Sequence, residues 1–325
     1  MNYKMMGRFN SQILCVVTLF MFPPLLICLF DGDIKAAYAF VFAMLIGVGI
    51  SWILALISKN SKSGFYAREG LICVGTAWIL IGIVGCLPFC FSKEIPGFVD
   101  ALFEMVSGFT TTGASILKDV EALPRGLIFW RSFSHWIGGM GVLVFLLAIA
   151  PSAKTNSGST VHLLRAESPG PEVGKLVPKI RKTAMILYII YMGLTVLNIV
   201  FLLAGRMPLF DALCTAFGTA GTGGFGIKND SLASYSPYLQ TVTSIFLFLF
   251  GVNFNLYYLM LIRRFRAAFK STELWTYLGI VAASIGLIAV NIYKIYGTAA
   301  ETVRQSAFQV VSVITTTGYA TSDFN

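Results

Sequence analysis

The sequence is poor in charged residues and almost free of histidine. Of its 325 residues only 12% are Asp, Glu, Lys or Arg, and 56% are hydrophobic, whereas a soluble domain carries about 25% charged residues. The two histidines, His135 and His162, are far apart and have no cysteine or second histidine at ligand spacing. The composition therefore excludes an ordinary soluble domain and argues against a metal centre.

Cysteine is present, but not in a pattern that predicts disulfides or zinc binding. No Cys-x-x-Cys occurs, and five of the six cysteines lie in or at the ends of apolar runs. Cys86 and Cys90 are four residues apart and share one helix face, where we expect small buried hydrophobic side chains.

Long apolar runs, by contrast, are abundant. A membrane-spanning helix needs about 20 mostly apolar residues, and lipid offers the backbone no hydrogen bonds, so each span is predicted to be helical. Seven segments qualify: 11–30, 37–57, 71–91, 127–150, 183–204, 238–262 and 274–297. The first is followed by CLFDGD rather than a small-residue cleavage site, so we interpret it as a retained helix and not a signal peptide. The sequence predicts an all-α polytopic membrane protein.

The basic residues gather on alternate connections between these spans. If the N-terminus is cytoplasmic, the inner segments 1–10, 58–70, 151–182 and 263–273 hold 15 of the 24 Lys and Arg residues but only four of the 15 acids. Cytoplasmic loops carry such an excess of Lys and Arg, so we expect a cytoplasmic N-terminus. The net charge of +9 is then explained without a nucleic-acid partner.

Three segments on the opposite side repeat one pattern, in which a short helix-like run ends in a Thr/Gly cluster. They are GFVDALFEMVSGFTTTGASI (97–116), PLFDALCTAFGTAGTGGFGI (208–227) and ETVRQSAFQVVSVITTTGYA (301–320). Aligned on the glycine after the last threonine, Gly113, Gly223 and Gly318 are equivalent, and Asp100 and Asp211 stand 13 and 12 residues before the first two. The repeat predicts a unit of helix, half-helix, Thr/Gly loop and helix.

This unit suits a pore for a cation. Irregular backbone is tolerated at membrane depth only where it is buried in protein or lines a wet cavity, and a half-helix entering from outside aims its partly negative C-terminal end at the membrane centre. The loops TTTGA, GTGG and TTTGY contain no Asp or Glu. Backbone carbonyls would therefore replace the ion's hydration shell. This indicates a large monovalent cation, with potassium as the first candidate.

GTGGFG, residues 221–226, also fits the GxGxxG spacing of a dinucleotide-binding turn. That turn requires a strand before it, a helix directly after it and an acidic residue about 20 residues on. Here a helix-like run precedes the glycines and no acid lies from Leu232 to Ile262. We therefore interpret the match as coincidental and predict no enzyme activity.

These motifs resemble the Trk/Ktr/HKT superfamily of potassium transporters, and the bacterial Trk-type membrane subunit in particular. The resemblance covers nearly the whole chain and is carried by SGFTTTGAS (107–115), TAGTGGFGIKNDS (219–231), ITTTGYATSDF (314–324) and RAESPGP (165–171). It implies two N-terminal helices followed by four helix–pore-loop–helix repeats around one pore. Two repeats are complete in this sequence, the third is incomplete and the fourth is absent, so we expect a fragment or truncated product of a longer transporter.

The resemblance also implies site residues and partners. Backbone carbonyls of the selectivity filter, which would bind potassium, are expected at Thr111, Thr112, Gly113, Gly221, Thr222, Gly223, Thr316, Thr317 and Gly318. Gly113 resembles the potassium-selective type, because some relatives with serine at the first filter glycine pass sodium. The family implies a homodimer in the bacterial cytoplasmic (inner) membrane, surrounded by lipid, with a cytoplasmic nucleotide-binding regulatory subunit for which 151–182 is a candidate contact. No covalent cofactor is expected.

The predicted organisation has five parts, and several polar residues have two interpretations each. The parts are 1–70 (helix pair and cytoplasmic loop), 71–150 (first repeat), 151–182 (cytoplasmic loop), 183–270 (second repeat) and 271–325 (incomplete third repeat).

Arg131 and His135 are expected to snorkel to the membrane interface, with a polar contact behind the filter as the alternative. Asn253 and Asn255 are expected to make interhelical hydrogen bonds, with pore lining second.

Asp100 and Asp211 are predicted to be caps or dipole partners at the starts of the half-helices rather than ion sites. For the whole chain, the leading prediction is potassium uptake through a carbonyl-lined pore. The alternative is a secondary transporter of another small solute or of sodium, with its site in broken helices.

Overall fold

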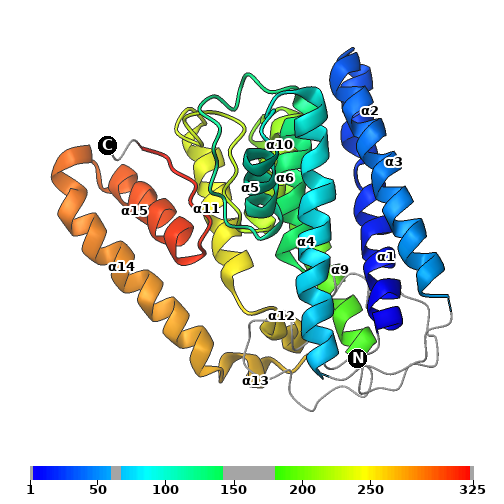
Figure 1. Cartoon of the computed structure of the whole chain (residues 1–325). Helices are drawn as coiled ribbons and strands as arrows, with labels where there is room; N and C mark the ends of the chain where they lie inside the picture. The colour runs from blue at the N-terminus through cyan, green and yellow to red at the C-terminus, as the bar shows by residue number, and fades with distance from the viewer. Residues whose placement is uncertain (1–2, 60–66, 142–179, 323–325) are drawn as a thin grey trace.

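The computed structural model describes residues 3–59, 67–141 and 180–322, and within these ranges it contains helices and no strands (Figure 1). The first half of the chain forms α1 (Tyr3–Leu19), α2 (Phe22–Phe30), α3 (Ile34–Ile57), α4 (Ala67–Ser92), α5 (Phe98–Phe109) and α6 (Arg125–Gly139). The second half forms α9 (Ile180–Ala204), α10 (Leu209–Ala220), α11 (Pro237–Gly251), α12 (Phe254–Leu261), α13 (Phe265–Phe269), α14 (Thr272–Tyr296) and α15 (Ala299–Ile314). The prediction of an all-helical chain is confirmed for the described residues.

The predicted spans are largely confirmed. Among the described residues, five stretches are long and apolar enough to cross a membrane: Tyr3–Phe30, Ile34–Ile57, Glu69–Ser92, Ala184–Ala204 and Thr272–Tyr296. The first is interrupted between α1 and α2, where Pro23 and Pro24 in the first turn of α2 cannot continue the hydrogen bonding of α1. For the predicted span 127–150, α6 is described to Gly139 and residues 142–150 lie outside the described ranges.

The predicted span 238–262 is not one straight helix. It breaks into α11 and α12, which meet at an angle of 84°. Val252 adopts an extended conformation, and Asn253 begins the new helix by accepting a hydrogen bond on its side chain from the backbone N–H of Asn255. The amide of Asn253 also donates to Glu273 of α14, with N–O distances of 3.1–3.2 Å. The interhelical role expected for Asn253 is confirmed, whereas Asn255 contributes its backbone to the cap.

The described helices repeat the predicted unit. A long helix (α4, α9 or α14) packs against a half-helix (α5, α10 or α15), and in the first two units a further helix (α6 or α11) packs against the same half-helix. Each half-helix has 12 to 16 residues, and 12 residues rise only about 18 Å, less than the thickness of a bilayer's hydrocarbon core. The N-terminal helices α1, α2 and α3 pack against the first unit, through α4 and α6.

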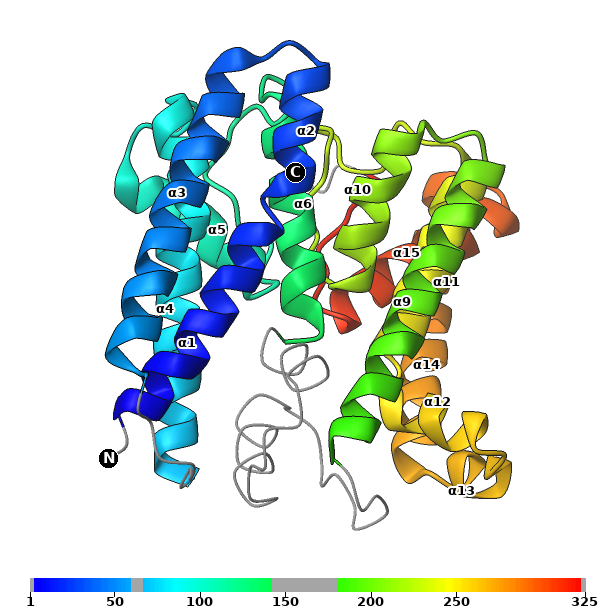
Figure 2. The ribbon, with the colours of Figure 1, turned by 90° about the vertical axis from the view of Figure 1, so that its right-hand side faces the viewer.

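The units contact one another through α6 and α11. Helix α6 packs on α5 and α2 of its own half and on α10 of the second unit, and α11 packs on α15 of the third. Every residue of α6 from Gly126 to Ile137 is buried. Figure 2 shows α6 between the helices of the first unit and α10. This enclosure places the polar side chains of α6 next to the loops that follow the half-helices.

Candidate functional site

The three Thr/Gly loops share one backbone conformation, although their sequences differ. The half-helices end at the capping residues Thr110, Gly221 and Thr315, and each cap is followed by a threonine in the left-handed region. These are Thr111 (φ 56°), Thr222 (φ 50°) and Thr316 (φ 58°). Two residues later a glycine is left-handed as well: Gly113 (φ 76°), Gly224 (φ 81°) and Gly318 (φ 83°). The left-handed conformation is costly for threonine. Three such threonines in equivalent places indicate that the surrounding structure specifies this backbone conformation.

Backbone hydrogen bonds fix the register between the copies. The N–H groups of Thr112, Gly223 and Thr317 each donate to a carbonyl oxygen near the end of the preceding half-helix, on Ser107, Gly218 and Ser312 respectively, at 2.9 Å. Gly113 is therefore equivalent to Gly224 and not to Gly223. The predicted register of the second loop is wrong by one residue: Thr222, Gly223 and Gly224 match Thr111, Thr112 and Gly113, while Gly221 is the helix cap.

The three loops meet one another in order. A Cβ atom added to Gly113 would overlap the carbonyl oxygen of Gly223, and one added to Gly224 would overlap that of Thr317. The glycine of one loop thus lies against the middle carbonyl of the next. Because only a residue without a side chain permits this approach, both glycines are required for it.

The loops carry unused hydrogen-bond acceptors. Within the part of the chain that the structure describes, no group donates a hydrogen bond to the carbonyl oxygens of residues 111–113, 222–224 or 316–318. Each group of carbonyls follows the C-terminal end of a half-helix, which is partly negative. Such oxygens can bind a cation in place of water.

Hydroxyl groups support the first and third loops. The Thr110 hydroxyl donates to the carbonyl oxygen of Val106 at 2.7 Å and lies 2.8 Å from the hydroxyl of Thr112. Thr315 repeats this geometry, with 2.7 Å to the carbonyl of Val311 and 2.8 Å to the hydroxyl of Thr317. In both loops the threonine pair ties the extended segment to the last turn of its half-helix.

The second loop has glycine at both of these positions, because α6 occupies the space of the threonine side chains. A Cβ on Gly221 would overlap the backbone carbonyl of His135, and one on Gly223 would overlap its imidazole ring. Gly138 and Gly139 of α6 allow equally close approach: a Cβ on Gly138 would overlap the Phe109 carbonyl at the end of α5, and one on Gly139 would lie 2.6 Å from the Cα of Gly221. The C-terminal end of α6 is thus inserted between two half-helices.

His135 joins the first two units. The backbone N–H of Phe225 donates to its Nε2 at 3.2 Å, and its Nδ1 lies 2.7 Å from the carbonyl oxygen of Gly108. An imidazole that accepts at Nε2 carries its proton on Nδ1, so the geometry requires the neutral Nδ1–H form donating to Gly108. The side chain is fully buried.

Arg131, one turn earlier on α6, is held in a buried ion pair. Its Nε contacts a carboxylate oxygen of Glu104 on α5, and its Nη1 donates to the carbonyl of Gly226 at 3.0 Å. The guanidinium lies 3.6 Å from the ring centre of Phe225, in cation–π geometry. Glu104 also accepts hydrogen bonds from the Ser115 hydroxyl and from the backbone beyond the first loop.

The expectation that Arg131 and His135 snorkel to the interface is wrong. Arg131 is 2% exposed and His135 is fully buried. Because α6 is covered on all sides, neither side chain can reach water, and a buried charge has to be paired instead. The polar contact behind the loops, which was the alternative, is what the structure contains.

Phe225 also connects the second loop to the third. Its carbonyl oxygen accepts a hydrogen bond from the hydroxyl of Tyr319 at 3.3 Å, and the carbonyl of Tyr319 accepts one from Ser312 at 2.7 Å. With His135, these bonds form a continuous path from Gly108 of α5, through the second loop, to Ser312 of α15.

Outside the loops, Asn229 ties the second unit to the first. Its side chain accepts from the backbone N–H of Val120 at 2.8 Å and donates to Asp119 at 2.8 Å, while its own N–H donates to Glu121 at 3.0 Å. The hydrogen bond from Asn229 lowers the pKa of the exposed Asp119 carboxyl below its ordinary value.

The acidic residues near the half-helix starts are not caps. The capping residues are Gly97 and Pro208, and neither makes a side-chain capping bond. Asp100 and Asp211 lie in the first turn, where a carboxylate complements the helix dipole, and Asp211 also accepts from the Tyr235 hydroxyl at 2.9 Å. Their predicted role as dipole partners fits these positions.

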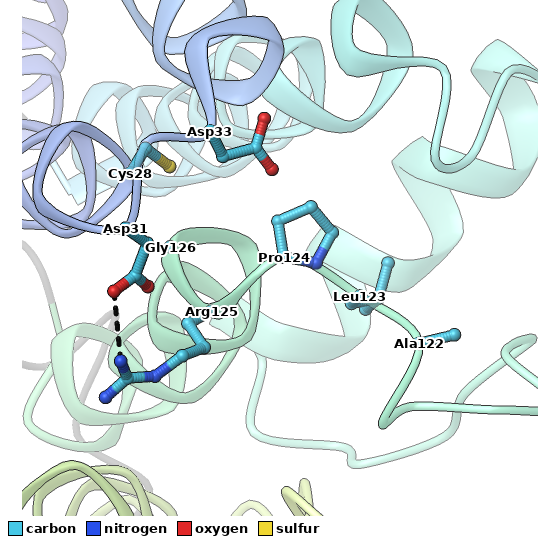
Figure 3. Close-up of a pocket in the computed structure, with 8 residues that line it drawn as sticks. All are labelled: Cys28, Asp31, Asp33, Ala122, Leu123, Pro124, Arg125 and Gly126. Atoms are coloured by element: carbon cyan, nitrogen blue, oxygen red, sulfur yellow. Dashed lines mark hydrogen bonds and ion pairs between the residues drawn. The ribbon is translucent and has the colours of Figure 1, made fainter.

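A cavity of about 530 Å³ lies apart from the loops, at the C-terminal end of α2 and the N-terminal end of α6 (Figure 3). Its two carboxylates already have partners: Asp31 pairs with Arg125 at 3.0 Å, and Asp33 caps α3 by accepting from Ala36. Across the described ranges, no group of three or more His, Cys, Asp or Glu side chains is placed to hold a metal ion. The three loops are therefore the strongest candidate site.

Comparison with known proteins identifies a family and several relatives of this chain. Residues 36–325 match the TrkH family model, described as a cation transport protein. The Trk system potassium uptake protein TrkH of Salmonella typhimurium is 34% identical over 328 residues, covering 99% of this chain and 67% of the relative, and that of Escherichia coli K12 is 33% identical with the same coverage.

A solved structure is similar over the same extent. The crystal structure of the potassium transporter TrkH from Vibrio parahaemolyticus aligns with a TM-score of 0.82 at 27% identity, covering 99% of this chain and 66% of that one. The chain thus spans about two thirds of the length of these proteins. The chain belongs to the TrkH family of cation transport proteins.

Proposed function

We propose that the chain takes part in potassium uptake, through a pore whose selectivity filter includes the carbonyl groups of residues 111–113, 222–224 and 316–318. The observation that carries the proposal is the set of three equivalent segments whose carbonyls accept no hydrogen bond from the described residues. Two of their glycines, Gly113 and Gly224, lie against the next segment's carbonyl. Relatives at 33–34% identity are named potassium uptake proteins.

Neutral carbonyls favour potassium over more strongly hydrated ions. No Asp or Glu occurs in residues 110–114, 221–225 or 315–319, so the segments offer dipoles rather than charges. Dipoles can offset the hydration energy of a large monovalent ion, whereas a divalent ion calls for carboxylates. Among the described residues, a Cβ on Gly318 would meet nothing within 4 Å, so a further carbonyl segment, which the family resemblance implies, would have room beside it.

We propose that the pore lies in the bacterial cytoplasmic membrane with the N-terminus in the cytoplasm. The N-terminal end of α1 and the basic segment around α13 lie at the same end of the molecule (Figures 1 and 2), as the positive-inside rule requires for two cytoplasmic segments. Homodimer formation and a nucleotide-binding regulatory subunit remain proposals from the family resemblance. Their candidate contact, 151–182, falls mainly outside the described residues.

Ion uptake tests the proposal. The intact gene is expressed in a bacterium that lacks its own potassium uptake systems, and growth and rubidium uptake are measured at low external potassium. We expect rescue by the wild type and reduced uptake or reduced potassium-over-sodium discrimination for Gly113→Val and Gly224→Val at equal membrane abundance. Equal transport of sodium and potassium by the wild type would instead favour a sodium or general cation transporter, and no uptake would contradict the proposal.

A further inference from the structure

The second filter segment lacks the support that the first and third share. In those segments a pair of threonine hydroxyls 2.8 Å apart, Thr110 with Thr112 and Thr315 with Thr317, connects the loop to its half-helix. The equivalent residues of the second segment are Gly221 and Gly223, which have no side chain. Neither has the left-handed conformation that would by itself call for glycine, so close approach of another group explains them.

The group that approaches is His135, and it contacts the two glycines differently. A Cβ on Gly223 would overlap the Cγ, Nδ1 and Cδ2 atoms of the His135 ring, whereas a Cβ on Gly221 would overlap the carbonyl oxygen and carbonyl carbon of the His135 backbone. The imidazole therefore fills the place of the missing Gly223 side chain, and the backbone of α6 fills the place beside Gly221.

The imidazole also forms hydrogen bonds that hold the second loop, where no threonine hydroxyls are present to do so. Its Nε2 accepts from the backbone N–H of Phe225, one residue after the second segment, and its Nδ1–H donates to the Gly108 carbonyl at the end of α5. The threonine pairs tie each loop to its own half-helix. His135 instead ties the second loop to the half-helix of the first unit.

We propose that His135 is a positioning residue for the second filter segment, in place of the threonine pair used by the first and third. The proposal rests on the proposed function of these segments as a potassium filter. Through Phe225 and Tyr319 the same support reaches the third segment. Potassium selectivity then depends on a side chain of α6 that has no contact with the ion, and movement of α6 relative to α5 would change the filter.

A size-exchange cycle tests the contact. Gly223→Ala, His135→Ala and the double variant are made in the intact gene, with Gly221→Ala as the matched control in both backgrounds. We expect Gly223→Ala to lower the potassium-to-sodium uptake ratio strongly when His135 is present and to add no further loss when it is alanine. Gly221→Ala should be harmful in both backgrounds, because its clash is with the backbone. Equal damage by Gly223→Ala in both backgrounds would overturn the proposed contact.

Two amide variants then separate the hydrogen bonds. In His135→Gln the amide reaches the Nε2 position and can still accept from Phe225, whereas in His135→Asn it reaches only the Nδ1 position and can still donate to Gly108. We expect Gln to keep the uptake ratio within about twofold of wild type, and Asn to lose about fivefold, the ratio that one net hydrogen bond accounts for. Retained selectivity in Asn with loss in Gln would place the role in α5 and overturn the proposal.

The readouts distinguish this proposal from the proposed function. Membrane abundance and size-exclusion profiles in detergent are measured for every variant, so that loss of selectivity is scored only for folded protein. A wild type that takes up potassium while His135→Ala keeps the wild-type ratio would refute the positioning role alone. A wild type that takes up no potassium would refute the filter assignment itself.

Discussion

Gly224 offers the sharpest test of the register that the structure assigns. It is left-handed at φ 81°, and a Cβ would overlap the carbonyl oxygen of Thr317 in the next segment. In Gly224→Ala the left-handed conformation costs about 1–2 kcal/mol, and overlap in a packed region adds about 1–3 kcal/mol. The variant therefore loses about 2–5 kcal/mol, or relieves the overlap by displacing a filter carbonyl.

Gly297→Ala is the matched control. Gly297 caps α14 in the left-handed conformation, at φ 71°, but a Cβ there would meet no atom of the residues that the structure describes within 4 Å. The Gly297→Ala variant therefore has the conformational cost of about 1–2 kcal/mol but no steric overlap. Both variants share the backbone strain and differ only in the contact with a filter carbonyl.

The assay is potassium and sodium uptake in cells, normalised to the amount of folded protein in the membrane. We expect Gly297→Ala to keep the wild-type uptake ratio with slightly lower thermal stability in detergent. We expect Gly224→Ala to reduce either the folded fraction or, in what folds, the preference for potassium. Wild-type abundance together with a wild-type ratio in Gly224→Ala would refute the assignment of Gly224 to the filter.

Three further outcomes follow from the contacts around the loops. Arg131→Ala should destabilise the protein by about 3–5 kcal/mol, because it leaves the buried Glu104 carboxyl group without its cationic partner. Glu104→Gln combined with Arg131→Met should cost less than the sum of Glu104→Gln and Arg131→Met made separately; thermal unfolding in detergent measures both. Asn229→Ala should raise the pKa of Asp119 toward its ordinary value, so its stability deficit should shrink as the pH falls from about 4 through the lowered pKa of the wild-type carboxyl, below which the carboxyl is protonated in both proteins; a pH-independent deficit would speak against this contact. Asn253→Ala removes the cap of α12 and should cost about 1 kcal/mol with unchanged ion selectivity, whereas altered selectivity would point to a role in the pore.

The sequence was sufficient to predict most of the spans and the positions of the three loops, because both depend on local patterns. Each apolar run of about 20 residues predicts a membrane helix without reference to the rest of the chain. The repeated Thr/Gly clusters lie where the half-helices end. The break at Asn253 was missed because an apolar run continues on both sides of it. Its cause is a side chain that caps a new helix, which hydropathy does not record.

The predicted register of the second loop was wrong for a physical reason. Alignment on the glycine after the last threonine assumed that the loops differ only in composition, whereas the backbone bonds of Thr112 and Gly223 show them to be equivalent. One signal could have found this. Gly224 stands 13 residues after Asp211, the same spacing as Gly113 from Asp100.

The roles of Arg131 and His135 could not be read from α6 alone. Their spacing places them on one face of a helix, but the sequence of a single helix does not show which neighbours cover that face. The structure encloses α6 between α5 and α10. That arrangement depends on contacts between residues nearly 100 positions apart, such as His135 with Phe225.

The position of bound ions in the intact transporter measures most directly whether these carbonyls form a potassium filter. Crystals grown in rubidium or thallium salts are measured for anomalous scattering, since both ions substitute for potassium and scatter strongly. We expect peaks in contact with the carbonyl oxygens of Thr112, Gly223 and Thr317, and weaker peaks in Gly224→Ala. Ordered ions elsewhere in the membrane region, with none against these carbonyls, would contradict the filter assignment.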